Sequence, residues 1–460
     1  MNNNKTNYAT LMQKLLVSLD VFLLTLALLI SDGLHTSSLL EPRNWWMIIA
    51  FVVCVQTCFL GLGLYKSKLR EKLPGIFRRI ILAVSMALLI LVLLVKLLGL
   101  QQLNADQLFT ACLLSGLATF ALRYLLTKFN VLGFAKRRVL VLGSGQRAQI
   151  IDKRMRRAVD RECFNLVGFV RMDGDLSSEI DSKHLVQLNG SLFDYVISNR
   201  IDEVVVATDE RRTMLPIRQL FACKLRGVVV SEILDFIEQE TGQIAVNLIY
   251  PSWIIYSSGF SSGNDLRNSL DRIFNISLAL VVLLLTWPFI LLTMIAIKIE
   301  DGWSAPCFYW QERVGIHGKP FLIVKLRSMR IDAEANGAQW AQSEDDRVTK
   351  VGRVIRKYRI DELPQLYNVL IGDMGFVGPR PERPEFVDNL KQQIPYYEER
   401  HNVKAGLTGW AQLKYPYGAT VADAEEKLKY DLYYIKHRSF LLDLSILIQT
   451  AEIVLFGKGR

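Results

Sequence analysis

Four long apolar stretches fill most of the first 130 residues, and no other feature constrains the fold of this chain as strongly. Each stretch approaches the roughly 20 apolar residues that a helix needs to cross a lipid bilayer. Together they contribute much of the hydrophobic share of the chain, which is 51%. We therefore predict that residues 1–130 form four transmembrane helices, over about residues 11–30, 45–64, 80–100 and 108–126.

Three charged residues interrupt these stretches. Lys96 and Arg123 lie near the ends of their predicted helices, so we expect their charged groups to reach back to the membrane surface. Asp20 lies deeper, where a carboxylate is costly unless it has a partner. We expect Asp20 either to hold two helices together or to be a functional polar group.

The loops between the stretches predict the orientation of the chain in the membrane. The segment 65–79 contains six Lys and Arg residues, whereas the loop 31–44 contains only Arg43 and the loop 101–107 contains none. Because basic loops stay in the cytoplasm, the N-terminus and everything after residue 126 are predicted to be cytoplasmic. The first residues lack a small-residue cleavage site after the apolar stretch, which favours a retained membrane anchor over a signal peptide.

The overall charge indicates the class of partner. A net charge of +10 favours molecules that carry phosphate groups. Because the chain has so many apolar stretches, we expect a lipid surface rather than nucleic acid. The six cysteines form no C-x-x-C pair, so neither a disulfide framework nor a zinc site is indicated.

Residues 131–255 have the pattern of a Rossmann-like α/β domain. The segment 137–151, RRVLVLGSGQRAQII, is typical of a strand, a glycine turn and the start of a helix, and EVVVATD and GVVVSEI indicate further parallel strands. Gly143 and Gly145 fit the G-x-G-x-x-A turn that holds a phosphate against backbone amides, and Asp160 and Glu162 lie roughly where a ribose-binding acid would be. A fold that has kept its shape and lost its nucleotide is an equal alternative. No Tyr-x-x-x-Lys pair follows the turn, so hydride transfer has no support.

A fifth apolar stretch, residues 273–297, follows a Ser- and Gly-rich boundary at 256–264. A full membrane span here would move residues 298–460 to the outside, yet basic residues lie on both flanks. Proline in a helix removes a backbone donor and causes a kink. We expect a re-entrant helix that breaks at Trp287–Pro288 and returns to the same face, with an ordinary kinked span as the alternative.

Two adjacent acids, Asp361 and Glu362, lie among many basic residues. Paired carboxylates act in acid–base chemistry, in metal binding or as nucleophiles. Mg²⁺ prefers oxygen ligands and bridges to substrate phosphates, and arginine binds phosphate oxygens as a fork. The flanking residues Arg356, Arg380 and Arg383 are therefore candidates for binding phosphate. The alternative is a charged helix start with ion pairs along its surface.

Four motifs in the last 200 residues resemble those of the bacterial sugar transferase family, the monotopic polyprenyl-phosphate hexose-1-phosphate (phosphoglycosyl) transferases. They are QERVGIHGKPFLIVKLRSM (311–329), DELPQLYNVLIGDMGFVGPRPERPEF (361–386), KAGLTGWAQL (404–413) and YDLYYIKHRSFLLDLSIL (430–447). The whole chain resembles long members of the family, such as undecaprenyl-phosphate glucose phosphotransferases and the sugar transferases of PEP-CTERM exopolysaccharide loci. The resemblance implies a catalytic domain over residues 265–460.

The resemblance also implies a reaction. A sugar 1-phosphate, from UDP-glucose or UDP-galactose by preference, moves to undecaprenyl phosphate and UMP is released, as the first step of exopolysaccharide or capsule synthesis. Asp361 corresponds to the family's nucleophile, which forms a phospho-aspartyl sugar, and Glu362 to a Mg²⁺ ligand or general base. Arg380 corresponds to a phosphate-binding arginine, and Lys325 and Arg327 are further candidates in the site.

The expected architecture is a mixed-class membrane protein of the bacterial inner membrane. It has four transmembrane helices, a Rossmann-like α/β domain, and a re-entrant helix with a small cytoplasmic α/β catalytic domain. The family's re-entrant helix commonly breaks at Ser-Pro, whereas this chain has Trp287–Pro288, so only the proline is retained. The resemblance allows a homodimer. The alternative function is a membrane-anchored UDP-sugar-binding regulator or scaffold without transferase activity.

Overall fold

The computed structural model of the chain forms two compact units, Met1–Glu240 and Thr241–Arg460. The residues it describes are 4–35, 45–65, 73–97, 104–129, 136–154, 164–176, 180–188, 190–210, 215–260, 265–333, 345–415, 418 and 420–455.

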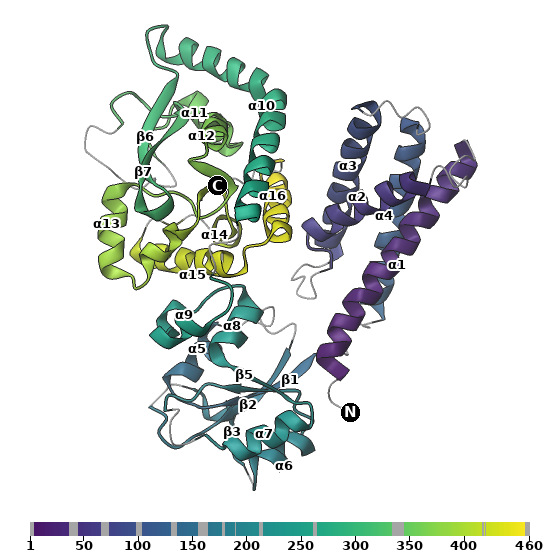
Figure 1. Cartoon of the computed structure of the whole chain (residues 1–460), viewed down its shortest axis with the longest axis vertical. Helices are drawn as coiled ribbons and strands as arrows, with labels where there is room; N and C mark the ends of the chain where they lie inside the picture. The colour runs from purple at the N-terminus through teal and green to yellow at the C-terminus, as the bar shows by residue number, and fades with distance from the viewer. Residues whose placement is uncertain are drawn as a thin grey trace. The chain divides into compact units, whose positions relative to one another are not determined.

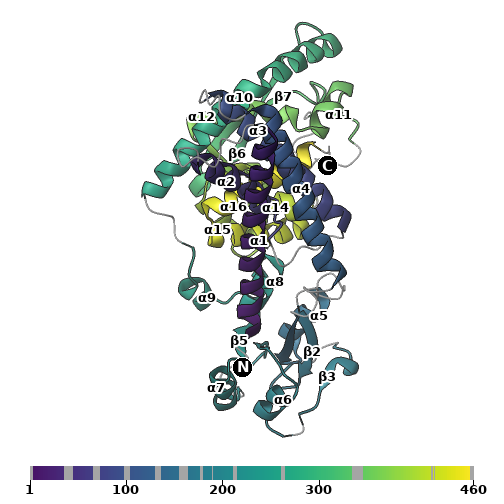
Figure 2. The same cartoon turned by 90° about the vertical axis from the view of Figure 1, so that its right-hand side faces the viewer.

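The first unit begins with the four predicted apolar helices, which pack side by side (Figures 1 and 2). They are α1 (Asn4–His35), α2 (Trp45–Gly61), α3 (Leu73–Leu97) and α4 (Ala105–Lys128). Helices α1, α3 and α4 each contain a segment long and apolar enough to cross a membrane. Helix α2 has only 17 residues. At about 1.5 Å per residue it is slightly shorter than a bilayer core of about 30 Å.

A buried ion pair joins α1 to α4. Nη2 of Arg123 lies 2.5 Å from Oδ2 of Asp20, and both side chains are buried. The Arg123 guanidinium also lies over the ring of Tyr65. The prediction that Arg123 reaches the membrane surface is therefore wrong. The charge turns inward because pairing with Asp20 offsets the cost of burying both groups. Asp20 accordingly holds two helices together.

The first unit continues with the predicted Rossmann-like domain. Its five parallel strands have the spatial order β3-β2-β1-β4-β5, which is typical of doubly wound dinucleotide-binding folds. Figure 1 shows helices on both faces of the sheet. The elements are β1 (Arg137–Leu142), α5 (Gln146–Arg154), β2 (Phe164–Val170), β3 (Leu185–Val186), α6 (Leu192–Ser198), β4 (Glu203–Val206), α7 (Ile217–Leu225), β5 (Val229–Glu232) and α8 (Ile233–Thr241).

The second unit packs two small sheets against helices. Strands β6 (Phe308–Val314) and β7 (Pro320–Leu326) form an antiparallel hairpin, and β8 (Met374–Val377) pairs in parallel with β9 (Ala405–Thr408). The helices are α9 (Pro251–Tyr256), α10 (Asp265–Asp301), α11 (Lys350–Lys357), η7 (Ile360–Gln365), α12 (Leu366–Ile371), α13 (Pro384–Gln393), η8 (Tyr397–Asn402), α14 (Trp410–Lys414), α15 (Val421–His437) and α16 (Phe440–Leu455).

Helix α10 is continuous through Pro288, so the expected break in the helix is absent. Figure 1 shows that the helix instead bends partway along its length. The two halves pack against the same compact unit. Ala279 belongs to a core with Leu366 of α12, and Ile297 belongs to a core with Ile355 of α11. Much of the rest of α10 exposes large apolar side chains, as expected of a helix that lies in lipid.

Candidate active site

The two adjacent acids lie on η7, a short 3₁₀ helix with a strained entry. Arg359, directly before it, has a left-handed backbone with φ of 59°, which is uncommon outside glycine. A 3₁₀ helix has three residues per turn, so neighbouring side chains point about 120° apart. Asp361 and Glu362 are both buried, at 8% and 6% exposure, and therefore face different surroundings.

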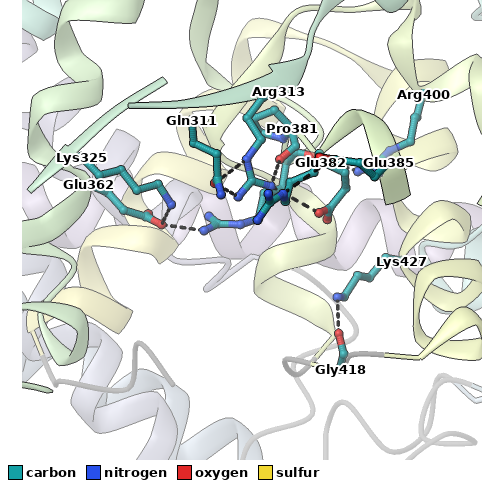
Figure 3. A network of polar contacts seen from close by, with 12 residues as sticks. Gln311, Arg313, Lys325, Glu362, Pro381, Glu382, Glu385, Arg400, Gly418 and Lys427 are labelled. Atoms are coloured by element: carbon teal, nitrogen blue, oxygen red, sulfur yellow. Dashed lines mark hydrogen bonds and ion pairs between the residues drawn. The ribbon is translucent and has the colours of Figure 1, made fainter. Parts of the chain in front are cut away.

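One oxygen of Glu362, Oε1, is surrounded by three cations. Nη2 of Arg380 lies 2.6 Å away, Nη1 of Arg359 lies 3.3 Å away and Nζ of Lys325 lies 3.7 Å away. Figure 3 shows Lys325 and Glu362 together at one end of a polar network. Two predicted site residues are thus brought to Glu362, Lys325 from strand β7 and Arg380 from the segment after β8.

The β6–β7 hairpin places three polar side chains of the site on one face. Its register pairs Tyr309 with Lys325 and Arg313 with Phe321. Because side chains alternate along a strand, Arg313 and Gln311 lie on the same face as Lys325. Oε1 of Gln311 accepts a hydrogen bond from Nε of Arg313 at 3.0 Å, as Figure 3 shows. The hairpin is therefore a rigid support for the cationic side of the site.

Two arginines that the sequence analysis missed hold the Pro-Arg-Pro segment in place. Nη1 of Arg313 donates to the carbonyl of Pro381 at 3.0 Å, and Nη2 of Arg400 donates to the carbonyl of Arg380 at 2.9 Å. Both contacts join residues far apart in the sequence, so no local pattern could identify them.

Arg400 is itself fixed by buried partners. Its Nη2 lies 2.9 Å from Oδ2 of Asp431, and its Nη1 donates to the hydroxyl of Tyr397 at 2.7 Å. Burial raises the pKa of Asp431 to about 6, although the adjacent Arg400 acts to lower it. This network ties η8 and α15 to the backbone that carries Arg380.

The two carboxyls have opposite electrostatic environments. Burial raises the pKa of Asp361 to about 6, and the neighbouring negative charge of Glu362 adds to the rise. Burial also acts to raise the pKa of Glu362, but Arg380, Lys325 and Arg359 together hold it well below its usual range. Burial lowers the pKa of Lys325 to about 8, against the opposing effect of Glu362. Glu362 is therefore a permanent anion, whereas Asp361 is a more basic carboxylate.

Asp361 keeps one oxygen uncommitted. Its Oδ1 is buried and accepts no hydrogen bond from the residues that the structure describes. Those residues also contain no cluster of three or more His, Cys, Asp or Glu side chains that could hold a metal. Mg²⁺ commonly takes one or two carboxylates and completes its shell with substrate phosphates and water. Asp361 and Glu362 fit that kind of site, and they do not fit a site made of protein ligands alone.

The other predicted site residues, Arg356, Arg327 and Arg383, differ in their surroundings. Arg356 on α11 is close enough to Asp361 to oppose the rise in its pKa. Arg327 follows β7, and its buried Nη1 has no hydrogen-bond partner in the described part of the chain. Arg383 directly precedes α13, where its Nε lies 3.5 Å from Oε2 of Glu385 and its guanidinium lies over the ring of Phe386. Arg383 is thus engaged with its own helix.

The second predicted site, the glycine turn, lies between β1 and α5 as expected. Gly143 has a φ of 120°, and Gly145 directly precedes α5. The backbone amides of this turn donate to carboxylates of the chain itself, from Asp175 and Asp209. The suggested ribose-binding acids Asp160 and Glu162 lie outside the described residues.

Comparison with known proteins matches the second unit to a family. A family model described as bacterial sugar transferase matches residues 266–457. A UDP-N-acetylgalactosamine-undecaprenyl-phosphate N-acetylgalactosaminephosphotransferase of Aeromonas hydrophila is 40% identical over 242 residues, which are 53% of this chain and 56% of that protein. A UDP-glucose:undecaprenyl-phosphate glucose-1-phosphate transferase of Xanthomonas campestris is 30% identical over 309 residues, which are 64% of this chain and 62% of that protein.

A shorter relative is matched over most of its length. A putative undecaprenyl-phosphate N-acetylgalactosaminyl 1-phosphate transferase of Bacillus subtilis is 51% identical over 132 residues, which are 29% of this chain and 73% of that protein. The chain spans a little over half of the Aeromonas relative. These matches confirm the resemblance seen in the four motifs, and the chain belongs to the bacterial sugar transferase family.

Proposed function

We propose that the chain transfers a sugar 1-phosphate from a UDP-sugar to undecaprenyl phosphate, giving undecaprenyl-diphospho-sugar and UMP. The observation that carries the proposal is the contrast between the two acids. Asp361 has a buried oxygen that accepts no hydrogen bond within the described residues, and Glu362 gathers three cations beside it. A nucleophile next to a cationic phosphate-binding surface is what attack on a diphosphate requires. The names of the relatives support the same reaction class.

The reaction takes place in two displacements at one phosphorus atom. In the first, a carboxylate oxygen of Asp361 attacks the phosphorus that bears the sugar, and the bond from this phosphorus to the UMP oxygen breaks. UMP leaves with the bonding electron pair. In the second, a phosphate oxygen of undecaprenyl phosphate attacks the same phosphorus and the bond to Asp361 breaks. Asp361 is regenerated as a carboxylate, so one phosphate-binding surface serves both steps.

Glu362 acts in this scheme as an anchor for cations rather than as a general base. Its pKa is held well below the usual range, and a weakly basic carboxylate is a poor proton acceptor. Its contacts hold Arg380, Arg359 and Lys325 together, and clustered cations of this kind attract the phosphate groups of a substrate. Neither displacement requires a proton to be removed from the attacking oxygen, because both nucleophiles are anions.

A Mg²⁺ ion is the cofactor we propose, held by Asp361 or Glu362 together with the diphosphate of the donor. When bound, it neutralises charge on the diphosphate and on the departing UMP. The uncommitted Oδ1 of Asp361 supports a metal contact at this position, since buried carboxylate oxygens otherwise have partners.

The two halves of α10 support a re-entrant arrangement. Ala279 and Ile297 lie 18 positions apart in the chain, on either side of Pro288, and each packs into the same compact unit. A helix crossing the bilayer could not keep both halves against one domain on one side of the membrane. We therefore propose that α10 enters and leaves the inner membrane from the cytoplasm. The active site then lies where a water-soluble donor meets a lipid acceptor.

The biological role that we propose is the first step of exopolysaccharide or capsule synthesis. The donor remains predicted as UDP-glucose or UDP-galactose from the resemblance. The relatives named above act on N-acetylgalactosamine and on glucose donors, so the test must include both classes.

The test is a UDP-sugar panel assayed for UMP release with undecaprenyl phosphate and Mg²⁺. We expect release with at least one donor in wild type and none in Asp361→Ala, with Asp346→Ala, an exposed aspartate in the same unit, as the matched control. Absence of a lipid-linked product with every donor in the panel would instead favour a UDP-sugar-binding scaffold.

A further inference from the structure

The phosphate-binding turn of the Rossmann-like domain is already filled by a carboxylate of the same chain. Asp209 lies shortly after β4, and its Oδ2 accepts hydrogen bonds from the amides of Gln146 at 2.9 Å and Leu176 at 3.1 Å. Its Oδ1 accepts from the amide of Arg147 at 3.0 Å. Gln146 and Arg147 are the first two residues of α5. In dinucleotide-binding members of this fold, the amides at this helix start hold the diphosphate of the ligand.

A second carboxylate closes the other side of the turn. Oδ2 of Asp175, which follows β2, accepts from the amide of Ser144 at 2.7 Å and from the amide of Met172 at 3.0 Å. Its Oδ1 lies 3.4 Å from the amide of Asp209. The oxygens of both acids therefore accept from N–H donors. This pattern identifies them as occupants of an anion site and not as ligands for a cation.

The two glycines are explained by these internal contacts. A Cβ atom on Gly145 would lie 1.9 Å from Oδ2 of Asp209, a distance that no side chain tolerates. A Cβ atom on Gly143 would lie 2.6 Å from the carbonyl oxygen of Ala207, the residue directly after β4. Gly145 makes room for the Asp209 carboxylate, and Gly143 makes room for a neighbouring strand. Neither glycine requires a nucleotide.

We propose that Asp209 is a built-in substitute for a ligand phosphate and that it closes this turn to nucleotides. A dinucleotide would have to displace the Asp209 carboxylate from three amides, or place its negatively charged diphosphate beside that carboxylate. The Rossmann-like domain accordingly keeps the shape of its fold without the dinucleotide site. The sequence left open a turn that binds a nucleotide and a fold that has lost its nucleotide, and these contacts favour the second.

The experiment uses the full chain in lipid nanodiscs and NADH as the probe. Binding is followed by NADH fluorescence in the presence of excess UDP, which competes for any nucleotide site in the transferase unit. We expect no saturable binding by wild type and saturable binding by Asp209→Ala, where the amides are released, at a Kd at least tenfold below the highest NADH concentration at which wild type shows none. Asp173→Ala, an exposed acid near the same turn, is the matched control and should behave as wild type.

A second variant covers the case in which Asp209→Ala does not fold. Asp209→Asn keeps the size of the side chain and removes its charge, so a smaller gain in NADH affinity is expected. Saturable NADH binding by wild type under excess UDP would overturn the proposal. It would also be overturned if folded Asp209→Ala or Asp209→Asn bound NADH no better than wild type.

Discussion

The dependence of the first displacement on pH follows directly from the geometry of the acid pair. Asp361 must be ionised to attack phosphorus, and burial raises its pKa to about 6. Lys325 must be protonated to stabilise the phosphate charge, and burial lowers its pKa to about 8. The rate of UMP formation should therefore rise through the first value, reach a plateau near neutral pH and fall through the second.

The size of the rise in rate at acid pH (the acid limb) and of the fall at alkaline pH (the alkaline limb) can be worked out from these two pKa values. With a pKa of about 6, roughly one tenth of Asp361 is ionised at about pH 5 and roughly nine tenths at about pH 7, so the rate rises about tenfold. With a pKa of about 8, Lys325 loses most of its charge by about pH 9, which gives a similar fall if the charge is essential.

The assay is a single-turnover burst of UMP with excess enzyme and no lipid acceptor. Omitting undecaprenyl phosphate matters because its phosphate titrates near neutrality, whereas the diphosphate of a UDP-sugar does not. Lys325→Arg is the matched variant, since arginine stays charged throughout and should remove the alkaline limb while leaving the acid limb. A rate that does not change between about pH 5 and 7 would refute the role of a raised Asp361 pKa.

Three further predictions concern stability and charge. Asp361→Asn should abolish UMP formation yet raise the melting temperature near pH 8. A carboxyl whose pKa is raised from 3.8 to about 6 on folding destabilises the folded state by about 3 kcal/mol when it is ionised, and asparagine removes that cost. A lower melting temperature would contradict this. Arg380→Lys keeps the charge but loses the fork, and the UMP burst should slow about 100-fold. Asp20→Leu should destabilise the helical region by about 3 kcal/mol in detergent unfolding, and adding Arg123→Leu should restore most of the loss.

Features with a local signature were predicted well. Apolar stretches of about 20 residues mark the N-terminal helices, and a glycine turn between a strand and a helix marks the Rossmann-like sheet. Asp361 and Glu362 stood out because their basic neighbours are close in sequence. Arg380 was predicted to bind phosphate, and the structure places its Nη2 2.6 Å from Oε1 of Glu362, a contact that was not predicted.

Features that depend on long-range packing were not predicted. Arg400 meets the carbonyl of Arg380 only because η8 folds back on the segment after β8. Asp209 reaches the glycine turn from 63 positions beyond Gln146. Arg123 turns inward because Asp20 lies on a helix more than 100 positions away. In each case the chemistry of the residue was visible, but its partner was set by the tertiary fold.

The central claim is that Asp361 forms a covalent phospho-sugar. Its most direct test is to incubate the protein with a labelled UDP-sugar and Mg²⁺, without lipid, and to locate the label by peptide mass spectrometry. We expect a sugar-phosphate adduct on Asp361 that disappears, with lipid-linked product formed, when undecaprenyl phosphate is added. UMP release that occurs only when both substrates are present, with no adduct on the protein, would contradict it.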